Sequence, residues 1–358
     1  MTEEQVSSIA LSLCTRPVLR LKCQLVKECG SATEACRHPS VREMAFSFMA
    51  RAKEEMAWVE KNRIRCICFT DNDYPTRLKQ CADAPVVLFA LGDVDLNPTR
   101  VLAVVGTRHI TEYGRKMCDV FIRELAQKCP GTLIVSGLAY GVDVHAHRAA
   151  LQGGLPTVGV MAHGLDQVYP ADHRQTAVEM INLGGGLITE FVSGTHIEKS
   201  YFVQRNRIVA GMADATLIVQ GAEKSGSMVT ARLAHDYDRD LFCCPGRVND
   251  IQSEGCNRLI QRQMAHMALC VDDLLETMNW PNELLRQQVR QDGIQQELFP
   301  NLTPEEERII STLRNSEGLH LNDICERCAM PVGDVSALLF SMELKGLVRQ
   351  GAGGHYCL

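Results

Sequence analysis

The feature that most constrains the fold is the alternation of strand and helix patterns between residues 101 and 151. Two short apolar runs, Val101–Val105 and Leu133–Val135, each end in small residues, and each is followed by a helical pattern. This change of period from strand to helix and back predicts a βαβ unit with parallel strands. Backbone N–H groups at the carboxyl ends of such strands form sites where anions bind.

The same alternation continues for another hundred residues. At least five apolar runs alternate with helical patterns, which predicts an α/β fold with an extended, Rossmann-like, doubly wound parallel sheet. The further strands are expected at 157–161, 187–191, 215–220 and 241–244, with a helix at 230–238. Apolar runs at 64–69 and 85–91 are expected to extend the sheet on one edge.

The length of 358 residues indicates more than one domain. We expect a small N-terminal helical domain at 1–62 and the sheet domain at 63–280. Residues 281–300 are polar and rich in glutamine, which is typical of a linker. Residues 301–358 show three helical patterns and a hairpin, which predicts a winged helix. Its five basic and eight acidic residues favour a protein-contact or structural role over duplex recognition.

Composition limits the class of protein. The net charge of −6 argues against a surface coated for nucleic acid, although a local basic groove is compatible with it. No apolar run is long enough to span a bilayer, and the sixteen cysteines are scattered, so we expect no membrane contact and a cytoplasmic protein. The pair Cys325 and Cys328 has no second pair nearby, so we expect no zinc, no other metal and no cofactor.

Two turns are candidate phosphate sites. The first strand ends in Gly106-Thr107-Arg108, where arginine adds a fixed positive fork. Alternatively, Gly106 merely makes the turn and Arg108 pairs with a carboxylate. Another strand is followed by Lys224-Ser225-Gly226-Ser227 and a helix start, which together form a phosphate cradle or a capped surface turn.

Two further groups invite alternatives. The segment Tyr201–Ile208 combines aromatics with Arg205, Asn206 and Arg207, a composition that suits a nucleic-acid strand. Alternatively, these arginines pair with carboxylates and Phe202 is part of the core. Asp143 and His147 lie four residues apart, which fits a metal pair less well than an N-cap and a packed polar residue.

Taken together, seven ordered blocks resemble the bacterial DNA-processing protein A family (DprA, also called Smf). The blocks are GTRHITEYG (106–114), SGLAYGVDVHAH (136–147), GLDQVYP (164–170), RNRIVAG (205–211), KSGSMVTA (224–231), PGR (245–247) and GCNRLI (255–260). The resemblance implies a homodimer that binds single-stranded DNA without cutting it. It also implies a partner in the RecA recombinase, which such proteins load onto incoming DNA during natural transformation.

The resemblance also implies DNA-binding residues. The arginine of the first turn and the lysine of the KSGS block correspond to Arg108 and Lys224. The other residues of the matched blocks are Gly106, Thr107, Ser136, Gly137, Arg205, Asn206, Arg207, Ser225, Gly226 and Ser227.

The chain also departs from the family pattern. Tyr140 stands where the family usually has arginine, Gln220 where glutamate is common, and Cys14-Thr15-Arg16-Pro17 where a glycine-rich hairpin would help to bind DNA. The alternative function is a nucleoside-monophosphate phosphoribohydrolase-like enzyme, because Gly194–Glu198 echoes half of its loop. A dinucleotide-binding oxidoreductase is a weaker alternative, since GxGxxG is missing.

Overall fold

The computed structural model describes residues 1–284, 302–314, 319–344, 347–350 and 355–357. The described residues form two compact units, one within residues 1–284 and the other within residues 285–358. Most of the predicted linker at 281–300 lies outside the described residues. None of the described helices combines the length and the apolar character needed to cross a membrane.

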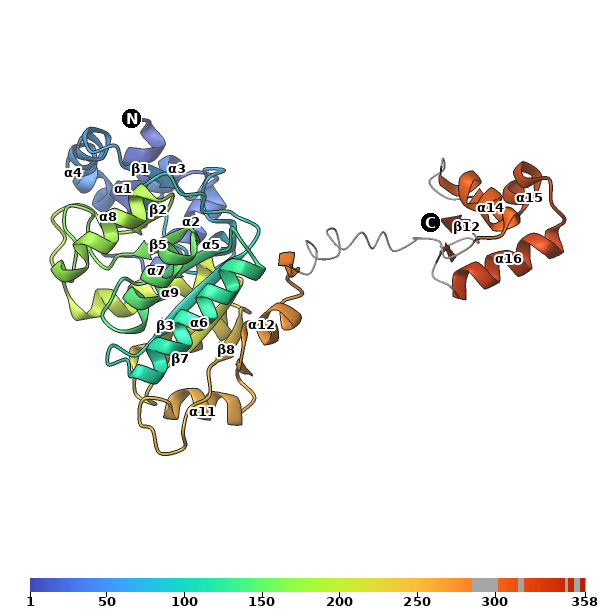
Figure 1. Cartoon of the computed structure of the whole chain (residues 1–358). Coiled ribbons are helices and arrows are strands. Elements are labelled where there is room, and N and C mark those ends of the chain that lie inside the picture. Colours follow the sequence, from blue (N-terminus) through green and yellow to red (C-terminus); the bar gives the residue numbers. More distant parts are fainter. Residues whose placement is uncertain (285–301, 315–318, 345–346, 351–354, 358) are drawn as a thin grey trace. The chain divides into compact units, whose positions relative to one another are not determined.

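The first unit is built on a nine-stranded sheet within the described residues (Figure 1). Its order is β1-β2-β6-β5-β4-β3-β7-β8-β9, and pairing is parallel except for β1–β2 and β2–β6. The strands are β1 (Arg65–Cys68), β2 (Val87–Leu91), β3 (Val101–Gly106), β4 (Leu133–Ser136), β5 (Thr157–Val160), β6 (Gly186–Thr189), β7 (Ala215–Gln220), β8 (Asp240–Cys243) and β9 (His266–Met267). The predicted Rossmann-like sheet is confirmed, with the first two strands at one edge.

Helices cover both faces of this sheet, so alternating residues of each central strand are buried on opposite sides. In β3, Leu102 and Val104 pack with α6 (Glu112–Lys128), α7 (Val142–Gly153) and α12 (Val271–Thr277). Their neighbours Ala103 and Val105 pack on the other face with α9 (Lys199–Met212) and α10 (Gly226–Asp236). The other described helical elements of this unit after β1 are α5 (Thr76–Lys79), a 3-10 turn (Ala171–His173), α8 (Arg174–Asn182) and α11 (Glu254–Gln261).

The N-terminal helices share a core with the sheet. They are α1 (Glu3–Leu13), α2 (Leu19–Cys29), α3 (Ala32–Arg37) and α4 (Arg42–Lys61). Leu11 and Val26 belong to the same buried cluster as Val101 of β3. The helical start of the chain is therefore confirmed, whereas its independence as a domain with a boundary at residue 62 stays a prediction.

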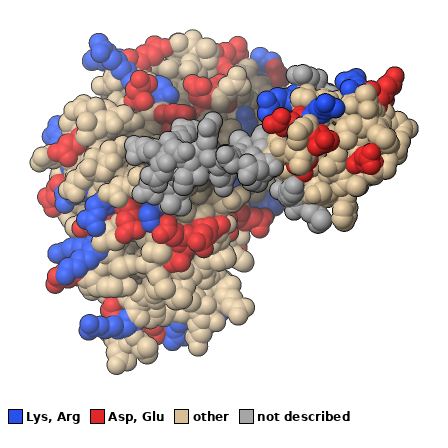
Figure 2. Space-filling view, turned by 45° about the vertical axis from the view of Figure 1, so that its right-hand side comes forward, with Lys and Arg blue, Asp and Glu red and all other residues tan. Residues whose placement is uncertain are grey.

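The second unit is the predicted winged helix. Its helices are α14 (Pro304–Arg314), α15 (Leu321–Cys328) and α16 (Val332–Leu344), and its small sheet has the order β10-β12-β11. The strands are β10 (Leu319–His320), β11 (Arg349–Gln350) and β12 (His355–Cys357). Ile309, Ile324 and Leu339 bring one side chain from each helix into its core. Acidic and basic side chains are interspersed on the visible face of each unit (Figure 2).

Candidate nucleic-acid interface

A groove opens where the order of the parallel strands reverses. The chain runs from β3 outward through β4, β5 and β6, and it returns to the other side of β3 as β7. In open α/β sheets this switch point, at the carboxyl ends of the strands, is where ligands bind. The groove has a volume of about 740 Å³. Ten of the twelve predicted site residues line it: Gly106, Thr107, Arg108, Gly137, Arg205, Asn206, Lys224, Ser225, Gly226 and Ser227.

The turn after β3 directs Arg108 into the groove. Gly106 has no room for a side chain, because a Cβ would lie 2.7 Å from the Gln220 carbonyl oxygen. The Thr107 amide donates to that same carbonyl at 2.7 Å, which fixes the turn to β7. Arg108 is exposed, and its guanidinium carbon lies 5.4 Å from the centre of the Phe202 ring. This cation–π contact orients the arginine without neutralising it.

A partly buried hydrogen-bond network connects this turn to the loop after β8. The Gln220 amide accepts from the Thr111 N–H at 3.1 Å and donates to Asp250 Oδ2 at 3.1 Å. Asp250 Oδ1 accepts from the Gln252 N–H at 3.0 Å, and the Thr107 hydroxyl donates to Gln252 Oε1 at 2.7 Å. The loop after β8 is thereby connected to the turn that carries Arg108.

The opposite wall of the groove is the start of α10. This helix begins at Gly226 rather than at the predicted Thr230, and Ser225 is its N-cap residue. The hydroxyls of Ser225 and Ser227 lie 2.8 Å apart, and no side chain of the described residues caps the helix N-terminus. Lys224 is exposed immediately before it. A lysine beside an uncapped helix N-terminus is a suitable environment for a phosphate.

Arg205 lines the groove from below and is 3% exposed. Its Nη1 donates to the carbonyls of Gly137 and Val160, which ties β4 to β5. Glycine is required at 137 because a Cβ there would overlap this guanidinium. Burial lowers the pKa of Arg205 to about 10, and the charge of Asp143 opposes this shift. Arg205 therefore supports the floor of the groove.

Two predicted site residues lie outside the groove lining. Ser136 is fully buried, and its hydroxyl donates to the Val104 carbonyl at 2.6 Å. Arg207 is 4% exposed and forms an ion pair with buried Glu190. The pairing alternative considered for Arg207 matches this contact, and the geometry gives no support to DNA contacts from either residue.

The predicted N-cap at Asp143 is wrong, because the N-cap residue of α7 is Gly141. Asp143 lies in the first turn of α7, where burial raises the pKa of its carboxyl. His147 is fully buried, and its Nδ1 lies 2.7 Å from the Thr157 hydroxyl. His147 is thus the packed polar residue that was expected, and the described residues contain no cluster of three or more metal-ligating side chains.

Two groove residues, Lys199 and Tyr169, are not among the predicted site residues, although Tyr169 lies within one of the seven matched blocks. Both line the groove; Lys199 is exposed at the start of α9, and Tyr169 is 45% exposed with its ring centre 5.9 Å from that of Phe202. A lysine two residues before the Tyr201–Ile208 segment was the available signal. Arg108, Lys199 and Lys224 form no ion pair with any described residue, so three free cations face the same groove.

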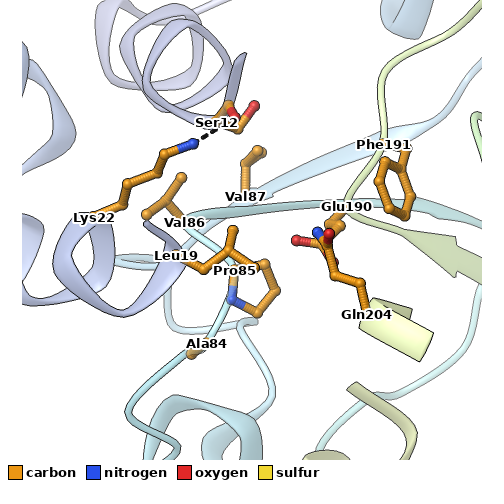
Figure 3. Close-up of a pocket in the computed structure, with 10 residues that line it drawn as sticks. All are labelled: Ser12, Leu19, Lys22, Ala84, Pro85, Val86, Val87, Glu190, Phe191 and Gln204. Carbon is orange, nitrogen blue, oxygen red and sulfur yellow. Dashed lines mark hydrogen bonds between the residues drawn. The ribbon is translucent and has the colours of Figure 1, made fainter. Parts of the chain in front are cut away.

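A second, smaller cavity of about 70 Å³ lies between the N-terminal helices and the sheet (Figure 3). The side chain of Lys22 points to Ser12, away from Glu190 and Gln204 (Figure 3). Its ammonium group donates to the carbonyls of Ser12, at 2.9 Å, and Cys14. A lysine that satisfies the last carbonyls of α1 has a structural role, so this cavity offers no comparable phosphate site.

Comparison with known proteins agrees with this geometry. The profile of the family described as DNA recombination-mediator protein A matches residues 65–279, and that of the DprA winged helix domain matches residues 296–354. The chain belongs to the DprA/Smf family. Protein Smf of Escherichia coli is 30% identical over 303 residues, which cover 85% of this chain and 80% of that protein. DNA processing protein DprA of Bacillus subtilis is 35% identical over 232 residues, 64% of this chain and 77% of the relative.

Solved DprA structures share the fold. DprA from Streptococcus pneumoniae superposes with a TM-score of 0.63 and 29% identity, covering 77% of this chain and 98% of that one. DprA from Helicobacter pylori, whose structure is described as giving insight into a unique single-stranded DNA binding mode, superposes with a TM-score of 0.54 and 31% identity. It covers 63% of this chain and 97% of that one. The resemblance drawn from the seven sequence blocks is thus confirmed.

Proposed function

We propose that this DprA-family protein is a recombination mediator that binds single-stranded DNA in the groove beside β3 and β7. The observation that carries the proposal is the convergence of Arg108, Lys199 and Lys224, all without ion-pair partners among the described residues, on one groove. The uncapped N-terminus of α10 adds main-chain donors for a phosphate.

The mixture of groups in the groove favours a single strand over a duplex. Tyr169 and Phe202 offer aromatic surface beside the three cations, and stacking on such rings requires unpaired bases. The single-stranded DNA binding mode described for the Helicobacter pylori relative supports the same ligand.

The test is fluorescence anisotropy with a labelled deoxythymidine oligonucleotide and unlabelled duplex as competitor. Wild type should bind the single strand in preference to duplex, and Arg108→Glu and Lys224→Glu should each weaken binding. Lys53→Glu, at an exposed position of α4 outside the groove, changes the net charge equally and is the matched control. Equal binding by all four proteins would refute the assignment of the groove.

A mediator role also needs protein partners, and we propose a homodimer that loads the RecA recombinase in the cytoplasm. The edge strand β9 supports the dimer, because Met267 is 48% exposed and Leu269, just beyond it, is 60% exposed. Unpaired edges with exposed apolar side chains readily pair with another chain. A Met267→Glu, Leu269→Glu variant should become monomeric in light scattering and should accelerate RecA filament formation less than wild type. A dimer that survives both changes would rule out this edge.

We propose that the protein acts by binding rather than by catalysis. The phosphoribohydrolase alternative relied on Glu198, which is exposed at the N-cap position of α9 and is not among the groove-lining residues. Incubation with nucleoside monophosphates should release no free base. A release that Glu198→Ala abolishes would revive the enzyme alternative.

A further inference from the structure

Tyr140 is held rigidly in the turn between β4 and α7, at the position where the family usually carries arginine. Its hydroxyl donates to Asp172 Oδ2 at 2.9 Å, and its ring meets buried His173 edge-on, with centres 4.9 Å apart. The side chain is nevertheless 45% exposed. Two contacts therefore fix the orientation of a ring that still presents surface to solvent.

This turn packs directly against the turn that carries Arg108. A Cβ on Gly141 would overlap the Thr107 carbonyl, and the Val142 N–H donates to the same carbonyl at 3.1 Å. Ala139, on the other side of Tyr140 in sequence, lines the groove. Tyr140 is thus bracketed in sequence by residues that contact the Arg108 turn and line the groove, and its phenol interacts electrostatically with Tyr169, which lines the groove. Tyr140 itself is not a lining residue and lies beside the groove.

The chemistry around Tyr140 suits a base better than a phosphate. Asp172 is an exposed carboxylate beside the ring, and it repels phosphate groups. The hydrogen bond to Asp172 raises the pKa of Tyr140, so its phenol stays neutral. A neutral, immobilised aromatic ring can stack with any base with little loss of side-chain entropy.

We propose that Tyr140 is a stacking platform for one nucleobase of the single strand, next to the phosphate-binding groove. The proposal rests on the proposed DNA-binding function and extends its site beyond the groove lining. With tyrosine at this position the groove rim lacks the charge of an arginine, and the proposed contact with a base is insensitive to salt.

The test is an abasic scan: deoxythymidine oligomers, each with one base removed, are titrated into wild type and Tyr140→Ala in anisotropy assays. Tyr140→Ala should weaken binding to the intact oligomer about fivefold to 150-fold, the range for loss of one base–aromatic stack, with an unchanged salt slope. One abasic position should weaken wild type and have no further effect on Tyr140→Ala. Tyr140→Phe should retain most of the binding, because the ring and its edge-on contact with His173 are kept and only the hydrogen bond to Asp172 is lost.

Phe46→Ala is the control, since Phe46 is 80% exposed on α4 outside the groove. If wild type binds the oligomer and Tyr140→Ala binds equally well, or every abasic position costs both proteins the same, the stacking platform is wrong while the groove stands. If wild type binds no single strand, the proposed function fails and this inference fails with it. A urea unfolding curve that matches that of wild type, followed by tryptophan fluorescence, confirms that each variant is folded.

Discussion

Replacing Gln220 by glutamate tests the network that supports the Arg108 turn. Gln220 is fully buried and donates to Asp250 Oδ2 at 3.1 Å, so Gln220→Glu places two carboxyl groups side by side. Two unit charges about 4 Å apart repel by about 4 kcal/mol at an effective dielectric constant of about 20. The introduced carboxyl avoids part of this cost by retaining its proton, because the neighbouring charge raises its pKa in the folded protein.

The sign of the pH dependence follows from that shift. A carboxyl whose pKa is higher in the folded than in the unfolded state contributes stability at low pH, and the contribution is lost as pH rises through the folded-state pKa. In urea titrations, the free energy of unfolding of Gln220→Glu should therefore be about 2–4 kcal/mol lower than that of wild type at pH 8. The difference should be smaller at pH 5. Both tryptophans, Trp58 and Trp280, lie in the first unit, so their fluorescence reports on it alone.

The matched control adds Asp250→Asn to Gln220→Glu. The introduced asparagine amide can donate to the introduced carboxylate, which restores the hydrogen bond with its direction reversed. The double variant should recover most of the lost stability at pH 8 and should bind DNA better than Gln220→Glu alone. Additive losses in the double variant, or a Gln220→Glu protein as stable as wild type at pH 8, would refute the network.

Three further outcomes are expected. Three free cations in the groove should give a salt slope near −2, from about −0.7 per phosphate neutralised, so a rise from about 50 to 200 mM salt should weaken single-strand binding about 20-fold. A slope near zero in anisotropy titrations would contradict this. Arg207→Met leaves Glu190 buried without its ionic partner and should destabilise the first unit by about 3–5 kcal/mol in urea unfolding, whereas adding Glu190→Gln should recover part of the loss. If the double variant is the less stable protein, the ion pair was assigned wrongly. Burial lowers the pKa of His147 to about 3. Because unfolding then takes up a proton, the unfolding free energy should fall by about 2 kcal/mol from pH 6.5 to 5. The fall should be smaller in His147→Asn, and an equal fall in both proteins would count against a buried neutral imidazole.

The sequence predicted the sheet well because β-strands buried on both faces leave near-continuous apolar runs such as Val101–Val105 and Ala215–Gln220. Because their carboxyl ends meet at one edge of the sheet, the sequence alone indicates that Arg108 and Lys224 lie near each other. The start of α10 was predicted four residues late, because Gly226 and Ser227 are typical of loops and here form the first helical turn.

Burial of charged side chains was the harder problem. Arg205 and Arg207 belong to a segment whose composition suits a nucleic-acid strand, yet both are nearly inaccessible. The space for Arg205 exists only because Gly137, 68 residues away in sequence, lacks a side chain. Arg207 lies on α9, and its partner Glu190 is the residue that follows β6. Such contacts depend on tertiary packing, and no local pattern encodes them.

The most direct test of the central claim is a crystal structure of the full chain with a short deoxythymidine oligonucleotide. The account predicts one strand in the groove between the β3 turn and the start of α10, with phosphates within hydrogen-bonding distance of Arg108, Lys199 and Lys224. Oligonucleotide bound to the winged helix or to the N-terminal helices, with this groove empty, would contradict it.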